Sequence, residues 1–410
     1  MLPYSTKVKF LCGDQKTNWH ALGATQVIAT NILATPDIDS KFLAGAAQFF
    51  TKLLQFRSQR VQHVPWSFLH ILQMFRHTEC FDPRDKVYAP LCLAPDDVHQ
   101  YITPDYGNKT ILDVYTDVVR YCLTQPGHDL DFLGFAMHQK EAQAVETPQG
   151  VKSDLPSWVP NFSASLDLVP IPKVLHVPED LDRKRVVYFD RGAIPNHNGQ
   201  KIAAYSPLGD APSKSFIEGN ELHVSGVYID VLKDIIPDKG PDVEAVRAFA
   251  RERGRRWAIE SGHMYPTGGS WADAINRTIV LDVVYDYLGR PSERGGKHDA
   301  EFLKKPRAKL SLTEYRYQMN MRVARINAFT SRNLGLSQKL YALVIPNTAV
   351  IGDAIWALSG GQALYILRPV NRELNQYSFI GECYAHGLMD GEIVRMLHTG
   401  EAKVEDISLI

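Results

Sequence analysis

Seven prolines between Pro148 and Pro195 divide the chain into parts with different residue patterns. Because proline has no backbone N–H and a fixed φ angle, no long helix or central strand can run through this stretch. We therefore expect residues 148–210 to form a proline-rich connector that wraps around the rest of the protein. The expected regions around it are a mainly helical region at 1–147, a mixed strand and helix region at 211–330, and a β-rich region at 331–410.

Apolar residues recur at helical spacing in the first of these regions, and they predict helices at 41–57, at 65–76 and after Asn108. In the third of these helices, one buried side is expected to comprise Ile111, Leu112, Tyr115, Val118, Val119 and Cys122.

Beyond the connector, alternating residues in ELHVSGVYIDVLKDI predict a strand. The sequence IWALSGGQALYILRPV predicts a hairpin in which Gly360 and Gly361 form a two-residue turn. The fold class that follows is α+β, with a helical N-terminal part packed on a small C-terminal antiparallel sheet or barrel.

Two helices are expected between these strands because Ser270 with Asp273, and Ser311 with Glu314, fit the capping-box pattern. The first of them should stop at Gly289 and Pro291. The intervening segment 290–309 is charged and poor in branched apolar residues, so we expect it to form a mobile loop.

Composition argues against several classes of function. The net charge of −1 is unlike that of a nucleic-acid-binding protein. No apolar run reaches the roughly 20 residues of a membrane span, and five scattered cysteines favour a reducing, cytoplasmic location. Motifs for nucleotide, zinc or serine-hydrolase chemistry do not occur in the sequence, so no cofactor or metal is predicted. His63, His70 and His77 are spaced seven residues apart. On a helix, neighbouring members of this series would be about 10.5 Å apart, which is too far for two of them to bind one metal ion.

The stretch YSFIGECYAHGLMDGEIVRML, residues 377–397, contains the best candidate catalytic residues. Glu382, Tyr384 and His386 alternate, so they face one side of a strand. His386 can act as acid or base, and Glu382 can orient it. The distance weakens this hypothesis, since positions four apart on a strand are about 13 Å apart unless the strand bends. The alternative is a sheet-to-helix junction in which Asp390 caps the helix.

A second candidate cluster lies in DLPSWVPNFS. Trp158 and Phe162, fixed by neighbouring prolines, can line an apolar pocket that has Asn161 as its polar group. They can equally pin the connector to the core, and the sequence does not choose between the two. Together with Asp390, these three are the candidate substrate-binding residues.

Six stretches, in order along the chain, resemble fungal heterokaryon-incompatibility (HET) proteins. They are LCGDQKTNWHALGA at 11–24, DPRDKVYAPLCLA at 82–94, DLPSWVPNFS at 154–163, TGGSWADAINRTIVLD at 267–282, GDAIWALSGGQALYILRPV at 352–370 and FIGECYAHGLMDGE at 379–392. One departure from the family pattern is Pro90, where leucine is common, and we expect it to bend the helix end after Tyr88.

The resemblance is to the region that follows the HET domain in such proteins. The HET domain itself, which is similar to TIR domains and has a proposed NAD-cleaving or death-signalling role, is expected to be absent because its A-L-S-Y-x-W-G type motif does not occur here. No residue of this chain therefore inherits that role.

Two functions from different classes remain. One is a cofactor-independent enzyme of fungal secondary metabolism, a cyclase, isomerase or Diels–Alderase that encloses a hydrophobic terpenoid or polyketide and holds its reactive conformer. The other is a non-enzymatic sensor or adaptor of the heterokaryon-incompatibility type. The sequence favours the enzyme narrowly, since a recognition region without its signalling domain needs a partner in trans. It does not predict an oligomeric state.

Overall fold

The computed structural model describes residues 9–12, 14–18, 67–76, 78–125, 130–136, 144–146, 152–164, 170–171, 205–209, 214–236, 256–259, 262, 264–285, 291–294, 328 and 331–410. The expected helices at 41–57 and after Ser311 lie outside these residues.

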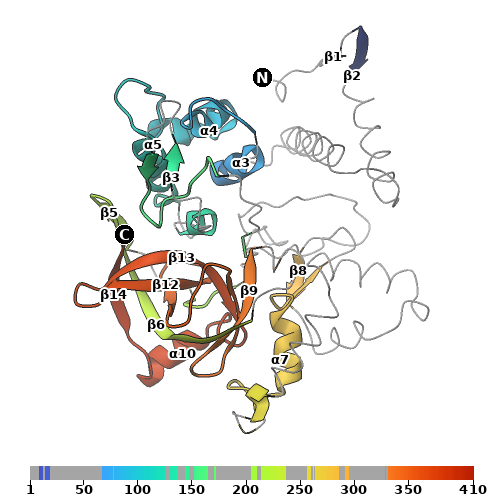
Figure 1. Cartoon of the computed structure of the whole chain (residues 1–410), viewed down its shortest axis with the longest axis vertical. Coiled ribbons are helices and arrows are strands. Elements are labelled where there is room, and N and C mark those ends of the chain that lie inside the picture. The colour runs from blue at the N-terminus through green and yellow to red at the C-terminus, as the bar shows by residue number, and fades with distance from the viewer. Residues whose placement is uncertain are drawn as a thin grey trace.

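The N-terminal part is built from short helices (Figure 1). They are α3 (Phe68–Phe75), α4 (Asp85–Tyr88), α5 (Ile111–Cys122) and the 3₁₀ helices η2 (Ala89–Leu93), η3 (Asp96–Gln100) and η4 (Asp131–Phe135). Ser67 caps α3, and Thr110 and Asp113 cap α5 reciprocally, which satisfies backbone N–H groups of the first turn. Helix α4 ends at Tyr88 and continues as η2, with Pro90 inside it, while the expected bend after Tyr88 stays a prediction.

An eight-stranded sheet forms the C-terminal part. Its strands are β5 (Phe216–Glu218), β6 (Glu221–Ile236), β9 (Arg332–Ser337), β10 (Ala342–Pro346), β11 (Ala354–Leu358), β12 (Leu364–Asn371), β13 (Gln376–Ala385) and β14 (Val404–Leu409). The other described elements are the strand pairs β1–β2 (Lys9–Cys12, Gln15–Asn18), β3–β4 (Ala144–Glu146, Lys152–Asp154) and β7–β8 (Val283–Tyr285, Pro291–Arg294), and the helices α7 (Trp271–Thr278) and α10 (Glu392–Thr399).

The sheet closes on itself. Strand β6 pairs with β11, β11 with β12 and β12 with β13, and β14 then joins β13 back to β6. A second closure runs from β13 through β10 and β9 to the other end of β6. The 16-residue β6 takes part in both closures and pairs directly with β5, β9, β11 and β14.

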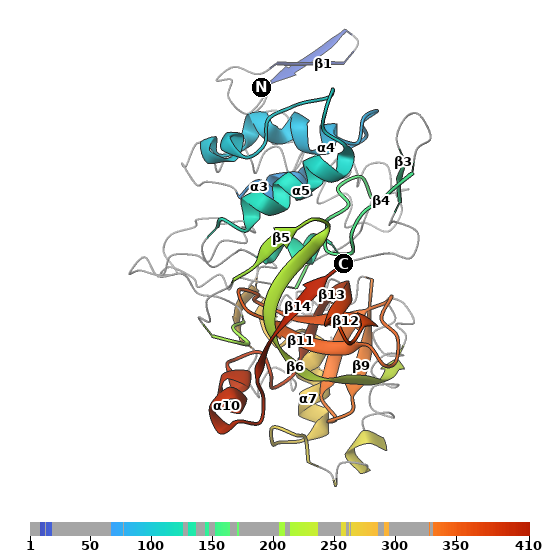
Figure 2. The ribbon, with the colours of Figure 1, turned by 90° about the vertical axis from the view of Figure 1, so that its left-hand side faces the viewer.

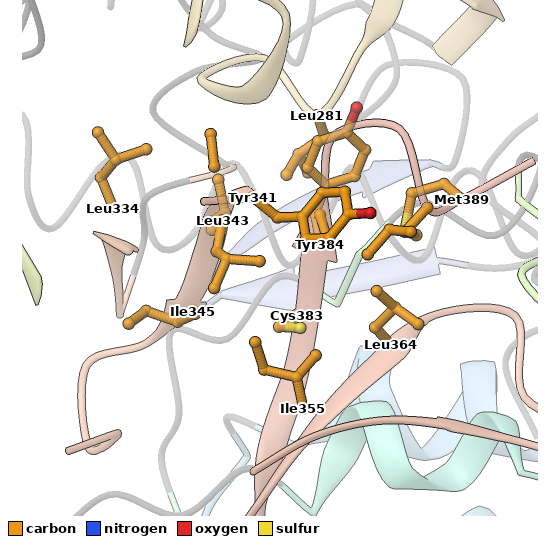
Figure 3. Close-up of a cluster of buried hydrophobic side chains, with 14 of the residues drawn as sticks. Leu281, Leu334, Tyr341, Leu343, Ile345, Ile355, Leu364, Cys383, Tyr384 and Met389 are labelled. Carbon is orange, nitrogen blue, oxygen red and sulfur yellow. The ribbon is translucent and has the colours of Figure 1, made fainter. Parts of the chain in front are cut away.

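The two faces of the sheet contribute to two hydrophobic cores. In β11, Ile355 and Ala357 join a core with α7 and α10, whereas Ala354, Trp356 and Leu358 join a core with α3 and α5. Helices α3 to α5 accordingly lie at one end of the molecule and α10 at the other, with the strands between them (Figures 1 and 2). In the first core, side chains from β10, β11, β12 and β13 meet (Figure 3). The predicted α+β class, with a helical N-terminal part and a C-terminal antiparallel sheet, is confirmed.

Three local expectations differ from the structure. Helix α7 ends at Thr278 rather than near Gly289, because Leu281 and Asp282 take positive φ angles and Asp282 forms an ion pair with Arg277. Strand β8 occupies the start of the segment 290–309, which was expected to be a loop; most of the rest of it lies outside the described residues.

The hairpin turn is longer than expected. It joins Leu358 to Leu364, and only Gly360 of the two glycines has a positive φ angle. Gly361 instead lies against the Tyr365 ring, where an added Cβ would meet the hydroxyl oxygen at 2.4 Å. Gly360 is therefore required for the backbone conformation of the turn, and Gly361 is required because a side chain would not fit beside Tyr365.

Candidate functional site

Tyr384 at the end of β13 lies close to His386, the first residue after the strand. The Tyr384 hydroxyl lies 3.3 Å from His386 Nδ1. Tyr384 is fully buried beside Tyr341 and Met389 (Figure 3), and its ring packs edge-on against Tyr205 at 5.8 Å. His386 is half-buried. Of this pair, His386 is the residue that a molecule in solution can reach without a rearrangement.

Tyr265 fixes the backbone at His386. Its hydroxyl donates to the His386 carbonyl (2.8 Å) and accepts from the Ala342 N–H (3.0 Å), while the His386 N–H donates to the Ala342 carbonyl (3.1 Å). The Tyr265 ring also contacts the imidazole, with ring centres 5.3 Å apart. Burial raises the pKa of Tyr265, so the hydroxyl keeps its proton and its donor role at neutral pH.

Glu382 is buried at the opposite end of this run, with 1% of its surface exposed. Its Oε2 accepts a 2.9 Å hydrogen bond from the Ile171 N–H, so the carboxylate holds a connector residue against β13. That the same carboxylate orients His386 stays a prediction.

Cys383 faces the apolar interior between Ile355 and Leu364 (Figure 3). Burial raises the pKa of its thiol well above the ordinary range, and the negative charge of Glu382 acts in the same direction. The reactive thiolate is therefore suppressed in the folded protein.

Alkylation with iodoacetamide at neutral pH should accordingly modify the exposed Cys80 and Cys92 in the native protein and leave Cys383 and the buried Cys122 intact. Peptide mass spectrometry measures the extent at each site. Addition of denaturant is the positive control, because it should make both buried thiols react. Rapid native labelling of Cys383 would contradict the packing of this core.

The chain passes from β13 to α10 through a turn with Gly387 and Gly391 in the left-handed region. The expectation that Asp390 caps the helix is wrong: the N-cap is Gly391, which has no side chain to bond the first turn. Instead, Glu392 reaches back and accepts from the Asp390 N–H at 2.7 Å, which leaves Asp390 exposed. The alternative description of this run as a sheet-to-helix junction fits the structure.

The second candidate cluster lies in the other core. Trp158 is buried and donates from Nε1 to the Asn220 carbonyl (3.0 Å), and Phe162 packs edge-on against Tyr115 at 5.1 Å. Asn161 Oδ1 accepts from the N–H groups of Ser163 and Ala164 at 3.0 and 3.2 Å. Phe162 thus packs the connector on the helical part and Trp158 bonds it to the β5–β6 turn, and both belong to a different core from Tyr384. The structure does not bring the two candidate clusters into one site.

Sequence reasoning missed the residue to which this connector is fastened. Arg76, at the end of α3, is 2% exposed and donates to the carbonyls of Ala164 (3.1 Å), Phe135 (3.4 Å) and Asn161 (2.6 Å). Burial lowers its pKa to about 10, so it is still charged at neutral pH. An arginine at the polar end of an amphipathic helix gives no signal that it is buried.

The described residues were also compared with the requirements of a metal site and of a membrane span. No group of three or more His, Cys, Asp or Glu side chains among them is placed to hold a metal ion. Within the same ranges, no helix has the length and apolar character that crossing a bilayer requires.

Comparison with known proteins gives one match. Residues 294–404 match the family model described as the Het-6 beta-barrel domain. Neither the curated proteins nor the solved structures gave a match to this chain. The matched segment contains strands β9 to β13 and α10, whereas β6, which closes the barrel, lies before it. Residues 294–404 are thus similar to a barrel domain of the heterokaryon-incompatibility type.

Proposed function

We propose that this chain is a recognition module of the heterokaryon-incompatibility type, which binds a partner protein through exposed apolar side chains of the barrel. The family match supports the type of module. The packing supports binding over catalysis at the predicted residues, since Glu382, Tyr384, Trp158 and Phe162 are buried and used in internal contacts.

Two turns of the barrel carry the surface that supports this proposal. Val350 and Ile351 lie in the β10–β11 turn and are 44% and 65% exposed, and Val370 and Leu374 at the β12–β13 turn are 57% and 63% exposed. We call these four residues the apolar turn patch. Apolar side chains gathered on a soluble protein are typical of interaction surfaces.

Arg368 on β12 is bonded to the β10–β11 turn. Its guanidinium donates to both Asp353 carboxylate oxygens at 2.8 and 2.9 Å and to the Thr348 carbonyl at 3.1 Å. The Asp353 carboxylate in turn accepts from the Val350 N–H at 2.8 Å. A buried carboxylate therefore fixes the turn that presents Val350 and Ile351, so this surface is preorganised for a partner.

The test is quantitative cross-linking of the full chain in a fungal extract, compared between the wild type and an Ile351→Glu, Leu374→Glu double variant. Proteins that bind through the patch should fall at least about tenfold in recovery, because a charge placed in an apolar interface is poorly tolerated. Phe81→Glu is the matched control, since Phe81 is 84% exposed in the helical part. A captured set that the double variant leaves unchanged would overturn the proposal.

The second candidate is the cofactor-independent cyclase, isomerase or Diels–Alderase acting on a hydrophobic terpenoid or polyketide. The observation in its favour is the Tyr384–His386 pair, in which a buried hydroxyl adjoins a half-buried imidazole that can donate to a developing oxyanion. Native mass spectrometry after exposure to a fungal metabolite extract tests it. If the chain is such an enzyme, a small molecule should be retained or converted, and its yield should fall in His386→Ala and Tyr384→Phe. Unchanged yields in both variants would show that these residues are not part of the site.

A further inference from the structure

A row of side chains crosses four adjacent strands on the face of the sheet opposite Leu222, Val224 and Leu409. The register aligns Phe216 on β5 with His223 on β6, His223 with Ser408 on β14, and Ser408 with Gln376 on β13. Directly paired residues of neighbouring strands have their Cβ atoms about 5 Å apart on the same face. The row is independent of the residues and of the patch discussed above.

Ser408, His223 and Glu218 form a chain of hydroxyl, imidazole and carboxylate. Ser408 Oγ lies 3.0 Å from His223 Nδ1, and His223 Nε2 lies 3.8 Å from Glu218 Oε2. A carboxylate beside Nε2 favours the tautomer with its hydrogen there, which leaves the Nδ1 lone pair to accept the serine proton. The serine and the imidazole have the order of nucleophile and base that activates a serine, whereas Glu218, with a 79% exposed side chain, is only an ion-pair partner.

The surroundings fix the imidazole in place. The Phe216 ring is stacked on it, with centres 4.7 Å apart and planes 12° from parallel. Glu221 and Asp406 are anchored on the same face: Glu221 accepts from Gln376 Nε2 at 2.9 Å, and Asp406 accepts from Ser225 Oγ at 2.6 Å. These two hydrogen bonds hold the polar side chains that share this face with His223.

Gln376 supplies an amide beside the same serine. It is paired with Ser408 across β13 and β14, and its position is held by the hydrogen bond to Glu221. A side-chain amide next to a nucleophilic serine can donate to the oxygen that becomes negative during attack on a carbonyl.

We propose that Ser408 is a nucleophilic serine activated by His223, and that this face hydrolyses esters with a small acyl group. Ser408 Oγ attacks the ester carbonyl and its proton passes to His223 Nδ1. The ester C–O bond then breaks, and the leaving alkoxide takes that proton from His223. Water hydrolyses the resulting acyl-serine by the same proton route, which releases the acid and restores Ser408. The acyl group is small because Ser408 is 7% exposed.

A neighbouring pair supplies a matched control. Ser225 lies on the same face of β6, but its hydroxyl donates to Asp406 Oδ1 rather than to an imidazole. A serine that only links two strands should behave like Ser225, whereas an activated serine should react with electrophiles.

The experiment is labelling of the full chain with a small fluorophosphonate, in which the Oγ–P bond forms as the P–F bond breaks. Intact mass and peptide mapping of the wild type should place one adduct on Ser408. Ser408→Ala should abolish labelling, Ser225→Ala should retain it, and His223→Gln should slow it by at least about tenfold, as loss of a general base predicts.

p-Nitrophenyl acetate serves as the turnover substrate for the same variants. An unlabelled wild type, an adduct mapped to another residue, or equal labelling of Ser408→Ala would each overturn the proposal. Because mapping of the wild type alone locates the adduct, the result stands even if one variant fails to fold. It is also separate from partner binding at the apolar turn patch, which these substitutions leave intact.

Discussion

Replacing Arg76 with alanine should destabilise the protein by about 3–5 kcal/mol, among the largest effects expected for a single residue. The guanidinium is 2% exposed and donates to carbonyls of Phe135, Asn161 and Ala164, which belong to two different segments. Its removal leaves those carbonyls without the donors that offset their burial. Urea denaturation followed by far-UV circular dichroism measures the change in the free energy of unfolding.

Arg120→Ala is the control for Arg76. Arg120 forms an ion pair with Asp117 three residues away, but its side chain is 52% exposed, so its loss should cost no more than about 0.5 kcal/mol. Arg76→Lys should lie between the two, since a single ammonium group cannot reproduce the fork of donors. A similar small cost for Arg76→Ala and Arg120→Ala would show that the buried guanidinium does not hold the connector.

Gly387→Ala should cost about 2–4 kcal/mol, because two separate effects add at this position. The residue has a φ angle of 82°, which disfavours any side chain, and an added Cβ would meet Thr267 Oγ1 at 2.5 Å and Cγ2 at 2.7 Å. Gly391→Ala is the matched control in the same junction, since its φ angle is 84° but nothing lies within 4 Å of the added atom. It should cost only about 1–2 kcal/mol.

A double-mutant cycle separates the two effects at Gly387. Thr267→Ala removes the Oγ1 and Cγ2 atoms and leaves the Thr267 Cβ atom, which is 3.1 Å from the added carbon. Gly387→Ala should therefore be less destabilising in the Thr267→Ala background than in the wild type, by about 1 kcal/mol or more. Equal costs in both backgrounds would contradict the close approach of these two residues.

The elements that were predictable from the sequence are those whose stability is local. The apolar stripe predicted a helix after Asn108, which is α5 at Ile111–Cys122, and the alternation in ELHVSGVYIDVLKDI predicted a strand, which is β6 at Glu221–Ile236. In the candidate site, Tyr384 lies next to His386 as predicted, although His386 is in the turn after β13 and not in the strand. The spacing of apolar residues is sufficient to predict these elements because it indicates which side of a helix or strand is buried.

The remainder depended on contacts between distant residues. The Glu382 carboxylate was assigned to His386, but a partner 211 positions away, Ile171, binds one of its oxygens. Ser408 and His223 are 185 positions apart and became neighbours only through strand pairing. The end of α7 at Thr278 depends on positive φ angles at Leu281 and Asp282. Neither residue is a glycine or asparagine, so the sequence does not indicate these angles. Such positions follow from the assembled sheet and not from local pattern.

Closure of the barrel by β6 has a consequence for how the protein is made. Ser225 on β6 and Asp406 on β14 are 181 positions apart, so a nascent β6 leaves the ribosome long before the strand that pairs with its edge exists. At about 5–20 residues per second, that edge stays open for roughly 10–40 seconds. Throughout that interval β6 is a template for wrong pairing with other chains. We therefore expect chaperone occupancy on ribosomes to rise after β6 emerges and to fall once β14 has paired.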